Sequence, residues 1–216
     1  MRSRAEIIAQ SISETLQSEI SEKGHASLVT CGGSSPIKIF EYLNLVKIDW
    51  KSVTVFSVDD RLVEPQSEYS NQKLIKSHLL QNNANKAMFI PLSTDLINKN
   101  LIPPKFSMML LGMGKDGHFA SLFPEMLLQM VNSTQPNLEF DISAEPAIFT
   151  TPPLGSPKLP RISMNLSLIL KSKRIILLVN GEEKKTILKL AGKDKTLPAY
   201  HLLKQTRIPI EIESLQ

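Results

Sequence analysis

The chain has 216 residues, of which 42% are hydrophobic and 21% charged, with a formal net charge of +4 at pH 7. This composition excludes intrinsically disordered and fibrous proteins, and the length suits one globular domain, which we expect to span residues 1–216. No apolar run approaches the roughly 20 residues that a membrane-spanning helix needs, and the N-terminal residues lack the apolar stretch of a signal peptide. We therefore expect a cytoplasmic protein with no membrane partner.

The basic residues are dispersed and aromatic residues make up only 6% of the chain. Nucleic-acid binders usually concentrate their cations in a stripe, so we expect no nucleic-acid partner and a few cations that hold a small anionic substrate. The single cysteine, Cys31, excludes an intramolecular disulfide and a cysteine-based zinc site. It ends an apolar run, which predicts a buried structural thiol.

Helices and strands alternate along the chain. A helix is predicted where Ile8, Ile12, Leu16 and Ile20 recur every four residues, with Gly24 as its stop. The predicted helices are residues 4–23, a helix that begins at Pro36 with Ser35 as N-cap, 70–80, and 182–190 before Gly192. The predicted strands are 28–31, 53–58, 108–111, 174–179 and an edge strand at 208–212.

This alternation predicts an α/β fold with a mainly parallel sheet and helices on both faces. Ligands of such sheets bind beyond the carboxyl ends of the strands, so the polar clusters that follow the strands should converge on one site. The clusters are Gly32–Ser35, Asp59–Arg61, Gly112–His118 and Asn180–Lys184. The proline-containing segment 126–160 is the least regular part of the sequence.

The segment Gly112–Gly117 matches the pattern G-x-G-x-x-G after a predicted strand. It lies in mid-chain, Pro124 interrupts the following residues, and no acid-terminated strand comes about 20 residues later, so we reject a nicotinamide-binding fingerprint. The glycines instead expose backbone N–H groups in a turn that carries Asp116 and His118. Histidine is the side chain that most often serves as a general base at neutral pH, and a strand end is where ligands of such sheets bind.

Two further clusters each allow more than one interpretation. The segment Gly32–Pro36 either cradles a phosphate with backbone N–H groups and two hydroxyls or is a plain capped helix start. The segment Asp59–Arg61 lacks the further ligands of a metal site, so an Asp–Arg pair that orients a substrate is favoured over a surface salt bridge. Charge runs also supply Lys158, Arg161 and Lys184 as candidate cations.

In this order, the segments resemble the 6-phosphogluconolactonase family. The motifs that carry the resemblance are Gly32–Pro36, Asp59–Arg61 with Ser70-Asn71, Leu110–Pro124, Ser156–Ser163, Val179–Lys184 and, weakly, Leu197–Ala199. The resemblance implies a three-layer α/β/α sandwich shared with glucosamine-6-phosphate deaminase and ribose-5-phosphate isomerase. It also implies hydrolysis of 6-phospho-D-glucono-1,5-lactone in the oxidative pentose phosphate pathway, without cofactor or metal.

The resemblance also implies roles for individual residues. His118 resembles the general base, Asp116 the acid that positions this region, and Arg61 a third catalytic group. The candidate substrate-binding and phosphate-binding residues are Gly32, Gly33, Ser34, Asp59, Gly117, Lys158, Arg161 and Lys184. Arg61, Lys158 and Arg161 are each expected to bind phosphate or stabilise the oxyanion. The expected partner is the sugar-phosphate lactone, and the chain is expected to be a monomer or weak homodimer.

The sequence departs from the family pattern at two positions. Leu62 stands where the family has Trp, and Phe119 where Thr is common. The first alternative function is that of the deaminase, but its glutamate is replaced by Phe123, and Arg61 stands where it usually has Tyr. The second is a non-catalytic sugar-phosphate sensor, which should have lost His118.

Overall fold

The computed structural model describes residues 2–128 and 137–215. Its helices are α1 (Arg4–Lys23), α2 (Ile37–Leu43), α3 (Asn71–His78), α4 (Pro124–Leu128), α5 (Leu166–Ile169), α6 (Glu182–Ala191) and α7 (Pro198–Lys204), with short 3-10 helices at Trp50–Ser52 and Asn82–Lys86. Its strands are β1 (Ala26–Thr30), β2 (Val53–Ser57), β3 (Asp59–Arg61), β4 (Met88–Ile90), β5 (Met108–Gly112), β6 (Ile148–Leu154), β7 (Leu159–Met164), β8 (Ile175–Leu178) and β9 (Ile210–Glu213).

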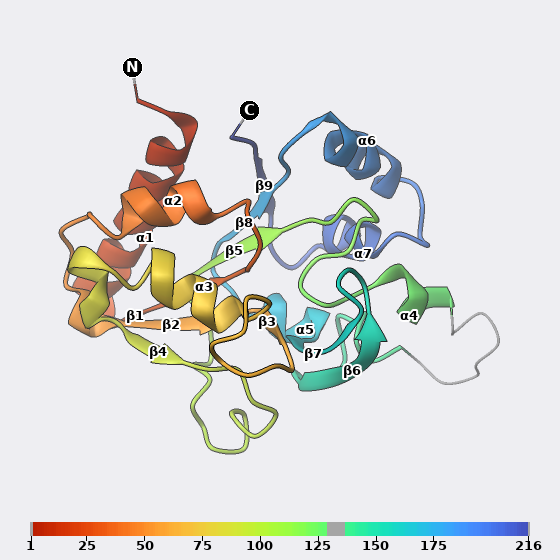
Figure 1. Ribbon diagram of the computed structural model, residues 1–216, viewed down its shortest axis with the longest axis horizontal. Coiled ribbons are helices and arrows are strands. Elements are labelled where there is room, and N and C mark those ends of the chain that lie inside the picture. Colours follow the sequence, from red (N-terminus) through yellow and green to blue (C-terminus); the bar gives the residue numbers. More distant parts are fainter. Residues whose placement is uncertain (1, 129–136, 216) are drawn as a thin grey trace.

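Six of these strands form a parallel sheet, which we call the large sheet, in the order β4-β2-β1-β5-β8-β9. The chain moves from β1 towards β4 on one side and then continues through β5, β8 and β9 on the other (Figure 1). The order therefore reverses between β1 and β5, where α/β proteins bind their ligands. The expected α/β fold with a mainly parallel sheet is confirmed, and β9 is the edge strand that the sequence predicts.

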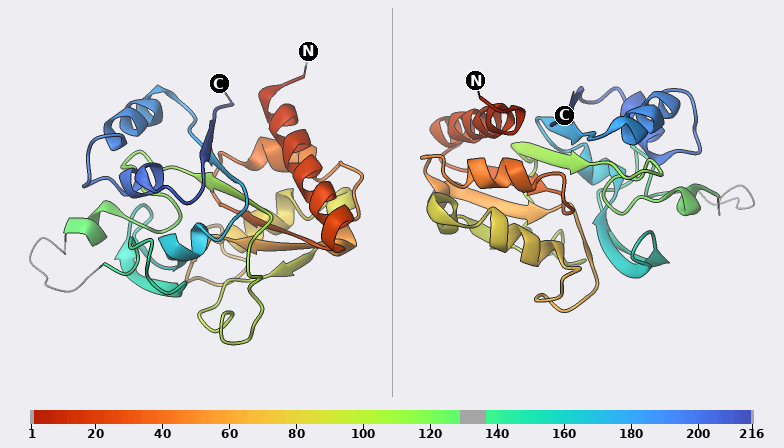
Figure 2. Two further views of the ribbon diagram at one scale, coloured as in Figure 1. Left: turned by 180° about the vertical axis from the view of Figure 1, so that it is seen from behind. Right: turned by 45° about the horizontal axis from the view of Figure 1, so that its top comes forward.

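Alternate residues of each central strand face opposite sides of the large sheet. In β1, Leu28 packs with the apolar faces of α1, α2 and α3, whereas Val29 packs with α5, α7 and the segment after β5. In β2, Val55 and Phe56 divide in the same way. Both faces are therefore buried, which explains why these strands are continuous apolar runs. Figure 2 shows the two layers on either side of the large sheet.

Capping residues fix two of the helices close to their predicted positions. Ser3 caps α1 by accepting from the Glu6 N–H, and Gly24 ends the helix in the left-handed region at φ 77°. Ser70 caps α3 by accepting from the Lys73 N–H. The predicted cap of α2 is wrong: Pro36 stands at the N-cap, without a side-chain hydrogen bond, and Ser35 lies outside the helix.

A second, three-stranded sheet, which we call the small sheet, has the order β3-β7-β6 and antiparallel pairing. The sequence analysis did not predict it, because β6 contains Pro152 and Pro153, which remove two backbone donors. The register shifts between Thr151 and Leu154, and this bulge accommodates the prolines. The segment 126–160 is thus more regular than expected where it is described, while residues 129–136 lie outside the described part.

The small sheet lies against the same face of the large sheet as α5 and α7. Ile148, Ile162 and Met164 from its strands join the apolar core that contains Val29 and Phe56. This layer therefore combines strands with helices, whereas the opposite layer consists of α1, α2 and α3. Within the described residues, no helix is long and apolar enough to cross a membrane.

Candidate active site

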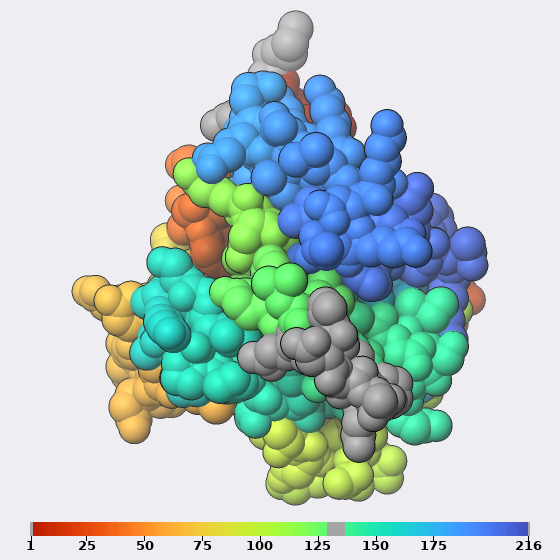
Figure 3. Space-filling model, turned by 90° about the vertical axis from the view of Figure 1, so that its right-hand side faces the viewer, coloured from red at the N-terminus to blue at the C-terminus, as the bar shows by residue number. Residues whose placement is uncertain are grey.

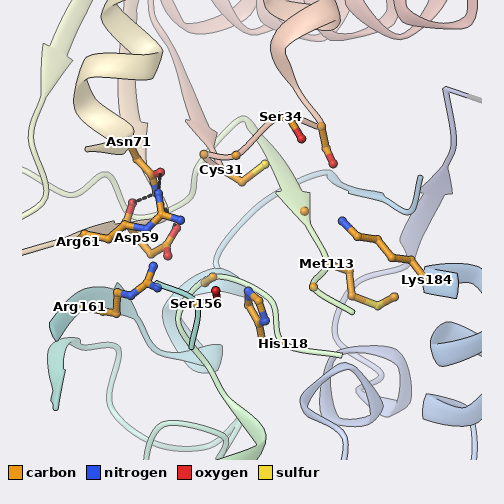
Figure 4. Close-up of a pocket in the computed structure, with 16 residues that line it drawn as sticks. Cys31, Ser34, Asp59, Arg61, Asn71, Met113, His118, Ser156, Arg161 and Lys184 are labelled. Atoms are coloured by element: carbon orange, nitrogen blue, oxygen red, sulfur yellow. Dashed lines mark hydrogen bonds between the residues drawn. The ribbon is translucent and has the colours of Figure 1, made fainter. Parts of the chain in front are cut away.

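A pocket of about 230 Å³ opens at the carboxyl ends of β1 and β5, where the strand order reverses. Its lining comes from the four polar clusters that follow the strands and from the small sheet. Figure 4 shows Asp59, Arg61, Asn71 and Arg161 on one side of the pocket, with Ser34 and Lys184 opposite. On the molecular surface, the loop after β5, the β6–β7 hairpin and α6 gather on one face (Figure 3).

The segment after β1 lines the pocket with Gly32, Gly33, Ser34 and Ser35. Gly33 adopts φ 77°, which only glycine adopts without strain. Neither serine hydroxyl caps α2, because the N-cap residue is Pro36 and it has no side-chain bond. These hydroxyls are therefore available to a ligand, as in the phosphate-cradle interpretation of this segment.

The segment after β5 presents an imidazole–carboxylate pair. His118 Nδ1 lies 2.5 Å from Asp116 Oδ1, which also accepts the backbone N–H of His118 at 3.2 Å. A carboxylate only accepts hydrogen bonds, so Nδ1 carries a proton, and in the neutral ring Nε2 is the acceptor. Gly114 allows this arrangement, since a Cβ there would lie 2.2 Å from the imidazole ring.

Burial of the Asp116 carboxyl disfavours its charged form, but the hydrogen bond and charge of His118 outweigh this effect and hold its pKa below the ordinary value. Asp116 therefore remains ionised and fixes the orientation of the ring. His118 lines the pocket, whereas Asp116 does not. This arrangement of a ring with one free nitrogen matches the geometry of a general base with an orienting acid.

Asp59 supplies a buried carboxylate, 7% exposed, at the start of β3. Its Oδ2 accepts from the Ser121 hydroxyl at 2.6 Å, and its Oδ1 accepts from Asn71 Nδ2 at 3.3 Å. Ser121 follows His118 by three residues, and its backbone N–H donates to Ser163 Oγ of β7. The carboxylate thus links the histidine-bearing segment to the small sheet.

Two arginines lie side by side in the small sheet, since Arg61 of β3 pairs in register with Arg161 of the adjacent strand β7. Arg61 Nη1 donates to the Tyr69 carbonyl and to Asn71 Oδ1, and Arg161 Nη2 donates to the Pro157 carbonyl at 2.9 Å. The Nε atom of each arginine is buried without a hydrogen-bond partner among the described residues. Like charges on paired residues repel each other, so an anion bound between the two guanidinium groups would relieve the repulsion.

Arg161 is only 3% exposed, and burial together with the nearby Arg61 charge lowers the pKa of its guanidinium. Its guanidinium carbon lies 5.6 Å from the centre of the Phe123 ring, and the His118 ring lies 4.7 Å from the same ring. Gly155 leaves room for this aromatic side chain, since a Cβ there would approach the ring to 2.6 Å. Phe123 therefore packs against both the imidazole and the guanidinium.

The opposite side of the pocket carries Lys184, in the first turn of α6. The part of the chain that the structure describes gives its ammonium group no ion pair. With Arg61 and Arg161 it brings three cations to the pocket against the single carboxylate of Asp59, which favours an anionic ligand. Cys31 also lines the pocket, but burial and the Asp59 charge raise the pKa of its thiol to about 12, so it is no nucleophile.

The structure brings most of the predicted site residues together. Those that line the pocket are Gly32, Gly33, Ser34, Asp59, Arg61, His118, Arg161 and Lys184. Asp116 and Gly117 lie behind the lining; Gly117 has φ 80°, and its carbonyl accepts from the Ala199 N–H. Lys158 is exposed and does not line the pocket, although Ser156 does.

The site prediction from sequence did not include Asn71, although the Ser70-Asn71 pair belongs to the motif after Asp59–Arg61. Its position at the start of a helix that follows a charged strand end was the available signal. Of the two departures from the family pattern, Leu62 is 47% exposed, whereas Phe119 is fully buried in the core. Neither residue lines the pocket.

Comparisons with known proteins agree with this geometry. Residues 2–209 match the family described as glucosamine-6-phosphate isomerases/6-phosphogluconolactonase. The chain is 33% identical over 208 residues to a 6-phosphogluconolactonase of Neisseria meningitidis, covering 90% of this chain and 87% of that protein. It is 32% identical over 210 residues to one of Caulobacter vibrioides, covering 91% and 86%.

Solved structures are similar over nearly the whole chain. A putative 6-phosphogluconolactonase from Neisseria gonorrhoeae superimposes with a TM-score of 0.83 at 30% identity, covering 98% of this chain and 94% of that chain. A 6-phosphogluconolactonase from Shewanella baltica gives a TM-score of 0.81 at 30% identity, covering 98% and 92%.

Proposed function

Since this chain belongs to the family of glucosamine-6-phosphate isomerases and 6-phosphogluconolactonases, and within it to the lactonases, we propose that it hydrolyses 6-phospho-D-glucono-1,5-lactone with His118 as the general base. The product is 6-phospho-D-gluconate, and the reaction belongs to the pentose phosphate pathway. The observation that carries the proposal is the His118–Asp116 pair beside a pocket with three cations.

In the proposed mechanism, His118 Nε2 takes a proton from water as the water oxygen attacks C1 of the lactone. The carbonyl oxygen becomes an oxyanion, which a guanidinium of the pocket stabilises. When the intermediate collapses, the bond between C1 and the ring oxygen breaks, and His118 returns its proton to that oxygen. Asp116 keeps its charge throughout and stabilises the imidazolium that forms.

The remaining polar groups hold the substrate. We propose that Gly33, Ser34 and Lys184 bind the phosphate and that Arg61 and Arg161 bind phosphate or the oxyanion. Gly32 and Asp59 complete the lining around them. Asp59 also offsets part of the cationic charge.

Gly117 and Lys158 are also predicted substrate-binding residues, and this role stays a prediction. Neither lines the pocket, so we propose that each acts indirectly. Gly117 shapes the turn that carries His118, since its φ of 80° favours glycine. Lys158 is exposed near Ser156 in sequence and would add positive charge for an incoming dianion.

The deaminase alternative is disfavoured by Phe123. The ring is 1% exposed and packs against both His118 and Arg161, so no carboxylate acts from this position. The phenyl ring of Phe123 has no acid–base atom, whereas the ring opening and amine chemistry of a deaminase need an acid–base group there.

The test is hydrolysis of the lactone above its spontaneous rate. We expect His118→Ala to lower kcat by about 10²- to 10⁴-fold, the contribution typical of a general base. His25→Ala is the matched control, because His25 is an exposed histidine whose one hydrogen bond among the described residues is to the Lys23 carbonyl. Full activity of His118→Ala would refute the mechanism, and ammonia release from glucosamine 6-phosphate without lactonase activity would favour the deaminase.

The expected cytoplasmic location and the expected monomeric or weakly dimeric state stay predictions. Sedimentation over a range of protein concentrations tests the second of these.

A further inference from the structure

Asn71 is a buried pocket residue to which the proposed mechanism gives no role. It is 2% exposed, begins α3 and lines the pocket. Its backbone N–H donates to Asp60 Oδ1 at 2.6 Å, which fixes the start of α3 on β3. Its side-chain amide is thereby held among the groups of the pocket (Figure 4).

The carboxamide oxygen determines how Arg61 is presented. Asn71 Oδ1 accepts from Arg61 Nη1 at 2.7 Å, and the same Nη1 donates to the Tyr69 carbonyl at 3.0 Å. One terminal nitrogen of the guanidinium is therefore engaged by the protein. Because a guanidinium is planar, fixing Nη1 also fixes the direction of Nη2 and of Nε, which is buried without a partner among the described residues.

The carboxamide nitrogen holds the neighbouring carboxylate at the same time. Asn71 Nδ2 donates to the Asp59 carbonyl at 2.9 Å and to Asp59 Oδ1 at 3.3 Å. Asp59 in turn accepts from Ser121 on the segment that carries His118. A continuous series of hydrogen bonds thus connects Arg61, through Asn71 and Asp59, to the segment that bears the general base.

The chemistry of the position favours an amide of this length. An aspartate would bring a second negative charge to about 3 Å from Asp59 and lose the donor, whereas leucine has a similar shape but neither donor nor acceptor. A longer side chain has no room, because the Gly32 backbone lies against the amide: a Cβ on Gly32 would stand 1.8 Å from Asn71 Oδ1.

We infer that Asn71 is the positioning residue of the active site that orients Arg61 towards the substrate while it holds Asp59. The inference rests on the proposed function, because it requires that Arg61 contacts the substrate. Asn71 itself acts through Arg61 and takes no part in proton transfer.

A double-mutant cycle tests this inference. The wild type, Asn71→Leu, Arg61→Ala and the double variant are compared in lactone hydrolysis and in calorimetric binding of 6-phosphogluconate. We expect Asn71→Leu alone to lower kcat/KM by about 10- to 100-fold, the range for a hydrogen bond to a charged group. In the Arg61→Ala background the same substitution should cost less than threefold, since its target is gone.

The kinetic parameter that changes is a second readout. The loss in Asn71→Leu should fall on the same parameter, kcat or KM, as the loss in Arg61→Ala, because both remove the same contact. Asn44→Leu is the matched control: Asn44 is also buried and bonds the His78 carbonyl and Asn82, away from the pocket. It should lower the melting temperature and leave kcat and KM unchanged.

Equal losses in both Arg61 backgrounds would overturn the inference. If Asn71→Leu does not fold, Asn71→Ser replaces it, because a serine hydroxyl is too short to reach Arg61. Another outcome is that the four proteins show the expected coupling between Asn71 and Arg61 in binding of 6-phosphogluconate while the wild type hydrolyses no lactone. In that case the proposed function fails and the inference stands. If Arg61→Ala changes neither binding nor hydrolysis, the inference falls.

Discussion

The two sheets of this protein differ in the charge that they bury. The strands of the large sheet bury mainly apolar side chains on both faces, with small hydroxyl residues among them, and α1, α2 and α3 cover one face with a continuous core. The small sheet carries buried polar groups instead, among them Asp59, Arg161 and Ser163. Apolar burial contributes most to the free energy of folding, whereas burying a cation costs desolvation energy. The buried arginines of the small sheet are therefore explained by binding of an anionic ligand and not by stability.

The largest expected effect tests the stabilising role of the large sheet. Leu28 in β1 is fully buried beneath the helices, so Leu28→Ala should lower the free energy of unfolding by about 2–5 kcal/mol. Its side chain faces away from the pocket, so kcat for the folded protein should stay unchanged. Chemical denaturation and hydrolysis measure the two quantities, and Leu45→Ala, at a leucine that is 57% exposed, is the control.

The reverse outcome is expected in the small sheet. Arg161→Met removes a buried charge that has no carboxylate within ion-pair distance in the described part of the chain, so the free energy of unfolding should stay the same or rise. The value of kcat/KM should fall by about 10- to 100-fold, because one charged contact with the substrate is lost. A variant that unfolds easily but keeps its activity would break the contrast between the sheets.

The smallest effect concerns two carboxyl groups with opposite pKa shifts. Burial raises the pKa of Asp60 despite backbone donors from Asn71, Gln72 and Arg61, whereas His118 holds the pKa of Asp116 low. The folded protein therefore binds a proton at Asp60 more readily than the unfolded chain does. Its contribution to stability falls as pH rises from the ordinary pKa of 3.8 to the raised value.

Asp116 contributes with the opposite sign. Its stabilisation is present above pH 3.8 and is lost as pH falls through the depressed pKa. The free energy of unfolding, measured from about pH 2 to pH 6, should therefore fall less with rising pH in Asp60→Asn, and rise less with rising pH in Asp116→Asn, than in the wild type. Parallel slopes in all three proteins would refute both assignments.

The sequence predicts the large sheet well because apolar periodicity reports burial directly. The regular spacing from Ile8 to Ile20 fixes α1, and the apolar run at 108–111 fixes β5. Apolar periodicity does not predict the small sheet, because β3 has the sequence Asp-Asp-Arg and β6 contains two adjacent prolines. These strands form because partners distant in sequence pair with them, so tertiary context outweighs local propensity.

The candidate site divides in the same way. Gly33, His118 and Lys184 follow strands of the large sheet, and all three line the pocket at the strand ends, as the strand-end rule predicts. Lys158 was selected from a charge run, but it is exposed and outside the lining. Asn71 was missed because an uncharged amide gives no signal by itself; its importance lies in the three groups that it touches, which only the folded chain brings together.

The close approach of Gly32 to the Asn71 amide also constrains how this protein can diverge. The two positions are far apart in the sequence, yet a methyl group at one would occupy the space of the other. A substitution at position 32 is therefore compatible with the fold only when the residue at position 71 shrinks, and that change would release Arg61. Position 32 is therefore restricted to glycine for as long as the Asn71 amide holds Arg61.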